Sequence, residues 1–221
     1  MAPLTLLFLL LATAQMTTQR LKNSPRQKPN AWLAVRIADD KLTTNIRRIQ
    51  ERLVARDSRF EKYLEPLDRL HVTVDVYDIN DGNVESARAA LNAVYPNLCR
   101  YSIPRYLSFD GADRFDGAVL FANLTQESST KMQKVYGLCF FFFAFCGIRS
   151  LNQYPYHPHM TIVEVPDEEP ELRQIIREID IEEIELSGEA FVDKLYLCRM
   201  HSDKPKNNEF CDVIIEQSID C

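Results

Sequence analysis

The chain has 221 residues, of which 46% are hydrophobic and 26% charged. These values fit one ordinary globular domain, or a two-lobed one, with a sizeable core. The net charge of −6 at pH 7 excludes a long basic track for nucleic acid, and the sequence has no solenoid repeat, although a small phosphate pocket remains compatible.

The N-terminus predicts a secretory signal peptide. Residues 4–11 are almost all apolar, and Ala12-Thr13-Ala14 has the small-x-small pattern of a cleavage site. No Lys or Arg precedes the apolar run, so the basic part of the pattern is weak. The alternatives are a membrane-proximal anchor or a disordered start. We expect residues 1–14 to be the signal peptide, 15–27 a linker and 28–221 the folded domain of a secreted protein, with a cytoplasmic protein as the alternative.

The first half of the chain alternates strand and helix patterns. Residues 31–37 alternate in the manner of a strand, with Trp32, Ala34 and Arg36 on one face. Two predicted helices follow, the first capped by Thr43 or Thr44 and extending to about Ala55, and the second extending from Asn83 to just before Pro96. The expected strands after the first are 70–79, 101–109 and 118–123.

The second half repeats this order loosely. Residues 129–148 predict a helix, and nine consecutive apolar residues, 138–146, make it apolar all round. The run is too short to span a bilayer, so we expect a buried core helix that packs on more than one side, and no transmembrane span in the mature chain. A strand through Val165, a helix over 170–179 and strands over 191–200 and 210–218 complete the domain, with a hairpin loop at 204–208.

Six cysteines agree with a disulfide-bearing secreted domain. Cys198 and Cys211 lie in neighbouring predicted strands and are a candidate pair. Cys139 and Cys146 lie in the apolar run and can instead be buried thiols. No spacing of Cys or His predicts a metal site. Asn123-Leu124-Thr125 is a glycosylation acceptor, which is meaningful only if the chain is secreted.

Two short tracts have the same pattern, His71-x-Thr73 and His159-x-Thr161. Residues i and i+2 of a strand share a face and lie about 6.6 Å apart. Each His therefore shares a face with its Thr, whereas Val72, Val74, Met160 and Ile162 point the opposite way. The two tracts lie about half a domain apart, and we expect each half to contribute one of them to a shared site.

These residue types suit acid–base chemistry on a phosphodiester without a metal. Imidazole titrates near neutral pH, so a neutral and a protonated histidine can together accept and donate a proton. A threonine hydroxyl beside each histidine can hold a phosphate oxygen. A single such motif in a strand is more often only structural, but a matched pair favours function.

The arrangement resembles the two-histidine phosphoesterase superfamily of the LigT type, and more closely the phosphoesterase-like domain of A-kinase anchoring proteins. The resemblance covers about residues 28–219. Its pieces are Lys28-Pro29-Asn30, Thr43-Thr44-Asn45-Ile46, Leu70-His71-Val72-Thr73, Phe115-Asp116-Gly117, Pro158-His159-Met160-Thr161, Leu195-Tyr196-Leu197-Cys198 with Met200, and Phe210-Cys211. It implies a bilobal α+β fold with antiparallel sheets around a central groove.

The resemblance also implies an activity and its residues. Members cleave cyclic or 2′,5′-linked nucleotide and RNA phosphodiesters, or only bind AMP or CMP. By position, His71, Thr73, His159 and Thr161 match the catalytic residues. Thr73 and the run His159-Met160-Thr161-Ile162 match the nucleotide contacts. We expect a phosphodiesterase without cofactor or metal, with a non-catalytic AMP- or CMP-binding module as the alternative and a structural interaction domain as a third class.

Partner expectations follow from the same comparison. The expected ligand is a nucleotide or a short RNA phosphodiester. The chain stops at Cys221 after the last predicted strand, so no kinase-anchoring helix is expected, and we expect a monomer.

Four further residues have two interpretations. His157 can line the site or lie at its solvent edge. Tyr154 and Tyr156 can stack on a base or pack in the core. Arg36 can bind a phosphate or be an ordinary surface arginine, and we favour the second.

Overall fold

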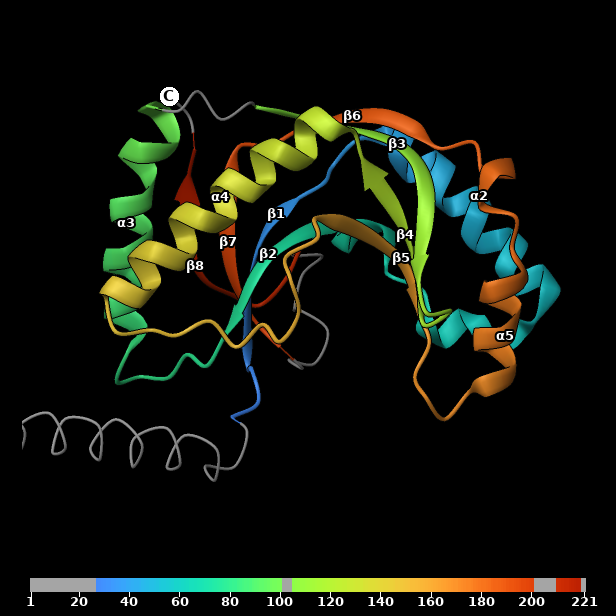
Figure 1. Cartoon of the computed structure of the whole chain (residues 1–221), viewed down its shortest axis with the longest axis horizontal. Helices are drawn as coiled ribbons and strands as arrows, with labels where there is room; N and C mark the ends of the chain where they lie inside the picture. Colours follow the sequence, from blue (N-terminus) through green and yellow to red (C-terminus); the bar gives the residue numbers. More distant parts are fainter. Residues whose placement is uncertain (1–26, 101–104, 201–209, 220–221) are drawn as a thin grey trace, which may run out of the picture.

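The computed structural model describes residues 27–100, 105–200 and 210–219. Within these ranges the chain forms eight strands and four α-helices (Figure 1). The elements in chain order are β1 (Ala31–Arg36), α2 (Asp40–Arg56), η1 (Ser58–Tyr63), η2 (Leu67–Arg69), β2 (His71–Tyr77), α3 (Val84–Arg100), β3 (Tyr106–Phe115), β4 (Val119–Leu124), α4 (Gln126–Phe145), β5 (His159–Glu164), α5 (Pro170–Glu178), η3 (Ile181–Glu183), β6 (Ser187–Phe191), β7 (Lys194–Arg199) and β8 (Val213–Ser218).

All eight strands belong to one antiparallel sheet in the order β6-β3-β4-β5-β2-β1-β7-β8. The strands that carry the two His-x-Thr motifs, β2 and β5, are neighbours at its centre. They pair only at Val72 and Met160, so each side of this junction is a four-stranded half. The predicted α+β class with two antiparallel halves is confirmed, and the halves are continuous through the motif strands.

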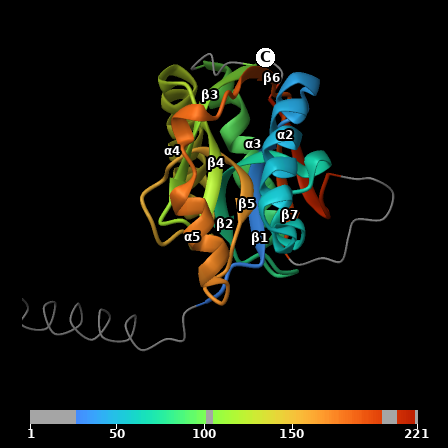
Figure 2. The same cartoon turned by 90° about the vertical axis from the view of Figure 1, so that its right-hand side faces the viewer.

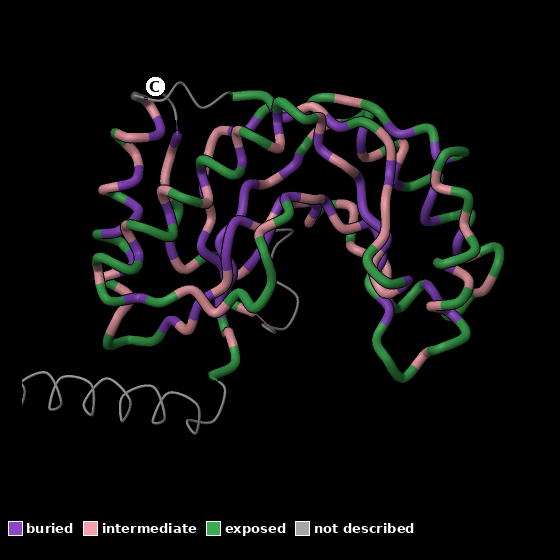
Figure 3. Tube along the Cα trace, in the orientation of Figure 1, coloured by how far each residue is buried: buried purple, intermediate pink, exposed green. Residues whose placement is uncertain are grey.

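Helices flank each half on its outer side. Helices α3 and α4 lie beside the half made of β2, β1, β7 and β8, whereas α2 and α5 lie beside the other half (Figures 1 and 2). Figure 3 shows that the buried positions concentrate on the strands and on the inward side of the helices. This layering is the usual consequence of helices that each bury one apolar stripe against a sheet.

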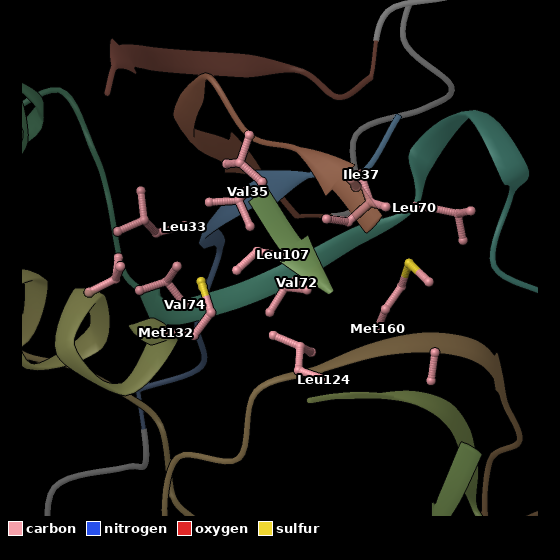
Figure 4. Close-up of a cluster of buried hydrophobic side chains, with 14 of the residues drawn as sticks. Leu33, Val35, Ile37, Leu70, Val72, Val74, Leu107, Leu124, Met132 and Met160 are labelled. Carbon is pink, nitrogen blue, oxygen red and sulfur yellow. The ribbon is translucent and has the colours of Figure 1, made fainter. Parts of the chain in front are cut away.

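The main hydrophobic core lies behind the motif strands. Val72, Val74 and Met160 are fully buried in it, together with Leu33 and Val35 of β1 (Figure 4). Val72 and Val74 alternate with the motif residues along β2, and Met160 lies between the two motif residues of β5. The core therefore fixes which way the motif side chains point.

Two helix boundaries differ from the prediction. Asp39 caps α2, and its carboxylate accepts a hydrogen bond from Leu42 N at 2.8 Å, so the helix starts before the predicted Thr43 or Thr44. Helix α3 continues through Pro96 to Arg100, although proline removes one backbone hydrogen bond. Its last turn is retained because Leu98 is buried in the core.

The apolar helix packs on more than one side, as expected, because α4 lies against both α3 and the strand β2, but it is not buried all round. Helix α4 buries Cys139 and Phe143, but Phe140, Phe141 and Phe145 are 47%, 60% and 81% exposed. Helix α4 therefore has more apolar side chains than its buried face accommodates, and the surplus phenylalanines are exposed to solvent. Among the described residues, no helix combines the length and apolarity needed to cross a bilayer.

Several sequence expectations fall outside the described residues. These are the signal peptide at 1–14, all of the 15–27 linker except Gln27, and the hairpin loop at 204–208. Strand β3 begins at Tyr106, and residues 101–104 of the strand predicted there lie outside the described residues. Strand β6 was not predicted by the sequence pattern. The predicted pair Cys198 and Cys211 forms a disulfide, and Cys139 and Cys146 are free.

Candidate active site

The structure brings His71, Thr73, His159 and Thr161 together on one face of the sheet, called here the site face. Val72 pairs with Met160 in an antiparallel register, which places His71 beside Thr161 and Thr73 beside His159. Side chains directly opposite in such a pair have Cβ atoms about 5 Å apart, and diagonal neighbours about 7–8 Å apart. The two imidazoles therefore lie diagonally across this pair, near enough that the charge of His159 lowers the pKa of His71.

The motif side chains are half-buried and their alternating neighbours are not accessible. The His71 side chain is 18% exposed, whereas Met160 and Ile162 are fully buried. The Met160 and Ile162 side chains therefore lie in the core and not on the site face, and the nucleotide contacts of this run stay a prediction. The Ile162 carbonyl is also occupied, because it accepts hydrogen bonds from Glu65 N at 3.0 Å and Gln50 Nε2 at 3.1 Å.

Both motif histidines are held by a backbone carbonyl two residues earlier in the chain. Nδ1 of His71 lies 2.8 Å from the Arg69 carbonyl, and Nδ1 of His159 lies 2.7 Å from the His157 carbonyl. A carbonyl oxygen only accepts, so Nδ1 carries the proton in each ring. The free lone pair of each neutral imidazole is consequently on Nε2, the atom that is left for a ligand or a proton.

Burial favours the neutral form of both rings. It lowers the pKa of His71 from 6.5 to about 4, although the hydrogen bond to the Arg69 carbonyl opposes the change, while the charges of Arg69 and His159 reinforce it. Burial likewise lowers the pKa of His159, with the charge of His157 acting in the same direction. In the free protein both histidines are therefore neutral at pH 7, and a bound anion would raise their pKa.

Aromatic side chains flank the motif on both sides. The ring centroid of Trp32 lies 4.4 Å from that of His71, and Phe210 lies 6.1 Å from it. On the other side, Phe115 and Phe121 each lie 5.0 Å from His159. These rings fix the orientation of the imidazoles, and their spacing is within the range of favourable aromatic pairs.

The four residues with two interpretations resolve differently. Arg36 pairs with His71 across β1 and β2, and its guanidinium carbon lies 5.6 Å from the Phe210 ring centroid, so it is a half-buried neighbour of the site. Tyr156 packs in the structure, because its hydroxyl donates to the Thr73 carbonyl and its ring stacks on Tyr136. His157 and Tyr154 are exposed.

Sequence reasoning missed two neighbours of His71. Trp32 belongs to a strand that was predicted correctly, but only the pairing of β1 with β2 places it against His71. Glu65 lies in the loop before β2, and one carboxylate oxygen is 3.7 Å from His71 Nδ1. Nothing in the local pattern around Glu65 predicts this contact, since it depends on how the loop folds against β5.

The glycosylation acceptor lies beside the site. Asn123 is half-buried in β4 and pairs with His159 on the neighbouring strand, so its side chain lies on the site face. Thr125 of the same triplet caps α4 by accepting a hydrogen bond from Ser128 N. A glycan on Asn123 and a ligand at His159 would therefore compete for the same space.

A separate cavity of about 910 Å³ lies between α2 and the chain around η3 and β6. Cations of α2, including Arg48 and Arg52, line one side, and carboxylates such as Glu182 and Glu185 line the other. It contains none of the four motif residues. In the described part of the chain, no group of three or more His, Cys, Asp or Glu side chains is placed to hold a metal ion.

Comparison with known proteins agrees with this geometry. The family model of the AKAP7 2'5' RNA ligase-like domain matches residues 29–217 of the chain. A search of curated proteins found no match to this chain.

Solved structures share the fold at low sequence identity. TT0787 of Thermus thermophilus is 16% identical with a TM-score of 0.57, and the match covers 86% of this chain and 97% of that one. LigT of E. coli in its apo form is 14% identical with a TM-score of 0.54, covering 87% and 98%. The MHV ns2 PDE domain is 14% identical with a TM-score of 0.54, covering 78% and 99%.

The family model spans nearly the whole described chain, and the fold of the solved structures extends over the same region. The chain belongs to the AKAP7 2'5' RNA ligase-like domain family, within the two-histidine phosphoesterase superfamily.

Proposed function

We propose that the protein is a metal-independent phosphodiesterase that acts on cyclic or 2′,5′-linked nucleotide and RNA phosphodiesters. One observation carries the proposal: His71, Thr73, His159 and Thr161 occupy one face of two paired strands, and Nε2 of each histidine is free of the backbone bond that holds its Nδ1. All four side chains come from one chain, which is consistent with a monomer as the functional unit.

In the mechanism, the two histidines transfer protons and the two threonines stabilise the charge of the phosphate. One histidine removes a proton from water or a ribose hydroxyl through Nε2, and the other donates a proton to the leaving oxygen. The hydroxyls of Thr73 and Thr161 donate hydrogen bonds to the non-bridging oxygens and stabilise their charge in the transition state. General acid–base assistance of this type contributes typically about 10²- to 10⁴-fold to the rate.

The solved structures support a nucleotide ligand. LigT of E. coli has been crystallised with ATP, with 3'-AMP and with NADP+, and the ns2 domain of MHV is described as a PDE domain. For this chain, the family match and the paired His and Thr side chains support a nucleotide as the ligand.

The test combines turnover with substitution of the threonines. Hydrolysis of 2′,3′-cyclic AMP and of a 2′,5′-linked adenylate is measured in EDTA for wild type, Thr73→Val and Thr161→Val. Thr130→Val, an exposed threonine on α4, is the matched control. The proposal expects turnover in EDTA, a loss of kcat in the first two variants and wild-type rates in the control. Activity that requires a divalent cation would contradict the metal-independent mechanism.

A second candidate function is nucleotide binding without turnover, with AMP or CMP as the ligand. The observation that favours it is the low pKa of both histidines, since burial leaves neither imidazole protonated as a general acid in the free protein at pH 7. Calorimetry with AMP and CMP separates the two candidates. Binding that depends on His71 and His159, without product from any diester, would favour the binding module.

We also propose that the protein follows the secretory route, with residues 1–14 as a signal peptide and 15–27 as a linker before the domain. The apolar run at residues 4–11 and the small residues before Gln15 support this. The Cys198–Cys211 disulfide is also typical of an oxidising compartment. Mass spectrometry of native protein should find an N-terminus near Gln15, whereas intact Met1 with titratable Cys198 and Cys211 thiols would contradict the proposal.

A further inference from the structure

Glu65 lies between the two motif strands and is fixed there by its backbone. Its N–H donates to the Ile162 carbonyl of β5 at 3.0 Å, and its own carbonyl accepts from the buried Gln50 amide at 2.7 Å. The same amide of Gln50 also donates to Ile162 O at 3.1 Å, and the preceding Leu64 forms a bridge with Val163. The position of Glu65 relative to β5 is therefore set by four backbone-directed contacts.

The side chain of Glu65 is directed at the other motif strand. Its carboxylate oxygen Oε1 lies 3.7 Å from Nδ1 of His71, within the distance of an ion pair if the ring is protonated. The Glu65 side chain is only 24% exposed, so solvent screens this contact weakly. No carboxylate is found in contact with His159 among the described residues. The contact therefore distinguishes two motif histidines that are otherwise held alike.

We propose that Glu65 is a positioning residue that stabilises the imidazolium of His71, and so makes His71 the histidine that carries the proton during turnover. This inference rests on the proposed phosphodiesterase function. In the step assigned to His71, the protonated ring donates its Nε2 proton to the leaving oxygen, while neutral His159 takes the proton of the attacking water or hydroxyl through its own Nε2. Nδ1 of His71 stays at the Arg69 carbonyl, 2.8 Å away, with the Glu65 carboxylate 3.7 Å from it. Exchange with solvent then returns a proton to His71 and removes the one on His159, so no other reactant is required.

In the free protein the Glu65–His71 pair is held mostly uncharged, so the ion pair forms only when a ligand is bound. Burial raises the pKa of Glu65 to about 7; the charge of Arg69 opposes this rise, and those of Glu164 and Asp68 add to it. In the free protein the pair therefore has a largely neutral form near pH 6, with the proton on Glu65 and none on Nε2 of His71. A phosphodiester anion at Nε2 favours protonation of His71, and Glu65 releases its proton to solvent as an ion pair forms.

The decisive variants are Glu65→Gln and Glu65→Asp. Glutamine keeps the size and the hydrogen-bonding capacity but cannot carry charge, and it removes a buried ionisable group, so we expect it to fold. Glu61→Gln, which replaces an exposed carboxylate of η1, is the matched control.

Two readouts separate this role from a purely structural one. NMR titration of the His71 ring in the AMP complex should give a pKa that is lower in Glu65→Gln than in wild type by about 1 or more, the shift typical of losing a partner charge. The kcat for 2′,3′-cyclic AMP, measured across its pH profile, should fall about tenfold or more for the same reason, with KM nearly unchanged. In Glu65→Asp, which keeps the carboxylate, both the His71 pKa and the kcat should lie between those of Glu65→Gln and wild type.

Failure of this inference is distinguishable from failure of the proposed function. If Glu65→Gln keeps the wild-type pKa of His71 and the wild-type kcat profile while His71→Ala abolishes turnover, the role of Glu65 is overturned and the function stands. If wild type neither binds AMP nor turns over any diester, the proposed function itself fails. If wild type only binds AMP, the titration of His71 in the complex still decides the role of Glu65.

Discussion

Val72 of β2 lies opposite Met160 of β5, and this single pair joins the two motif strands. Both side chains are fully buried in the main core. Because side chains alternate, the same register turns both His-x-Thr motifs to the other face of the sheet. A slip of one residue would bury the histidines and expose the aliphatic residues, so the core specifies the site.

The first prediction compares neighbours on opposite faces of β5. Met160→Ala should lower the free energy of unfolding by about 2–5 kcal/mol, the usual cost of truncating a buried methionine, and leave AMP affinity of the folded protein unchanged. Thr161→Val should change stability little and weaken AMP binding. Urea denaturation and calorimetry measure the two effects. Loss of affinity in Met160→Ala at full folding would contradict the assigned alternation.

The second prediction concerns stability at acid pH. The pKa of His71 is lowered by burial to about 4 in the folded state, against 6.5 for an ordinary histidine. Between these values the unfolded chain binds a proton that the folded protein does not, so stability falls as pH decreases from about 6.5 to 4. The contribution of His71 is about 3 kcal/mol at most, since one pKa unit corresponds to 1.36 kcal/mol.

The measurement is the free energy of unfolding between pH 4 and 7 for wild type and His71→Gln. Glu65 acts in the opposite direction between pH 4.5 and 7, because burial raises its pKa to about 7 and the folded state retains its proton. The difference between the two proteins therefore reports His71 together with its contact to Glu65. His157→Gln, which replaces an exposed histidine, is the control. Equal slopes for wild type and His71→Gln would contradict a buried neutral imidazole.

The sequence predicted the motif residues, their shared faces and the Cys198–Cys211 pair, because strand alternation and buried aliphatic neighbours are local signals. It did not predict the surroundings of His71. Glu65, Trp32 and Phe210 approach it from a loop and from other parts of the sheet, and strand order is a property of the whole sheet. It also overestimated the burial of α4, since consecutive apolar residues do not reveal which side of a helix a sheet will cover.

The third prediction tests the disulfide as a support for the site. Cys198 and Cys211 form a small buried cluster with Trp32, Ala34 and Phe210. The rings of Trp32 and Phe210 lie beside the His71 ring. Replacing both cysteines with alanine should lower the free energy of unfolding by about 3 kcal/mol, from the closure of a loop of this length. It should also weaken AMP binding.

Thermal unfolding and calorimetry on the double variant provide the measurement. Cys146→Ala removes a free, half-buried thiol and is the matched control, for which we expect a smaller loss of stability and unchanged affinity. Unchanged stability of the double variant would show that the disulfide does not support the site.

The fourth prediction concerns Asn123. It pairs with His159, so a glycan attached there would cover the site face. Protein expressed through a secretory pathway should therefore bind AMP only in the fraction that lacks a glycan at Asn123. Separation of the two forms followed by calorimetry tests this, with Asn123→Gln as the unglycosylated reference. Equal affinity in the glycosylated fraction would place the ligand elsewhere.

The central claim is that both motifs act on one phosphate group, and a double-mutant cycle tests it most directly. The measurement is kcat/KM for 2′,3′-cyclic AMP in EDTA for wild type, His71→Ala, His159→Ala and the double variant. Residues that act as a unit are strongly non-additive. We predict that each single variant loses about 10²-fold or more and that the double variant loses little beyond that. Additive losses, or activity that survives in the double variant, would contradict the shared site.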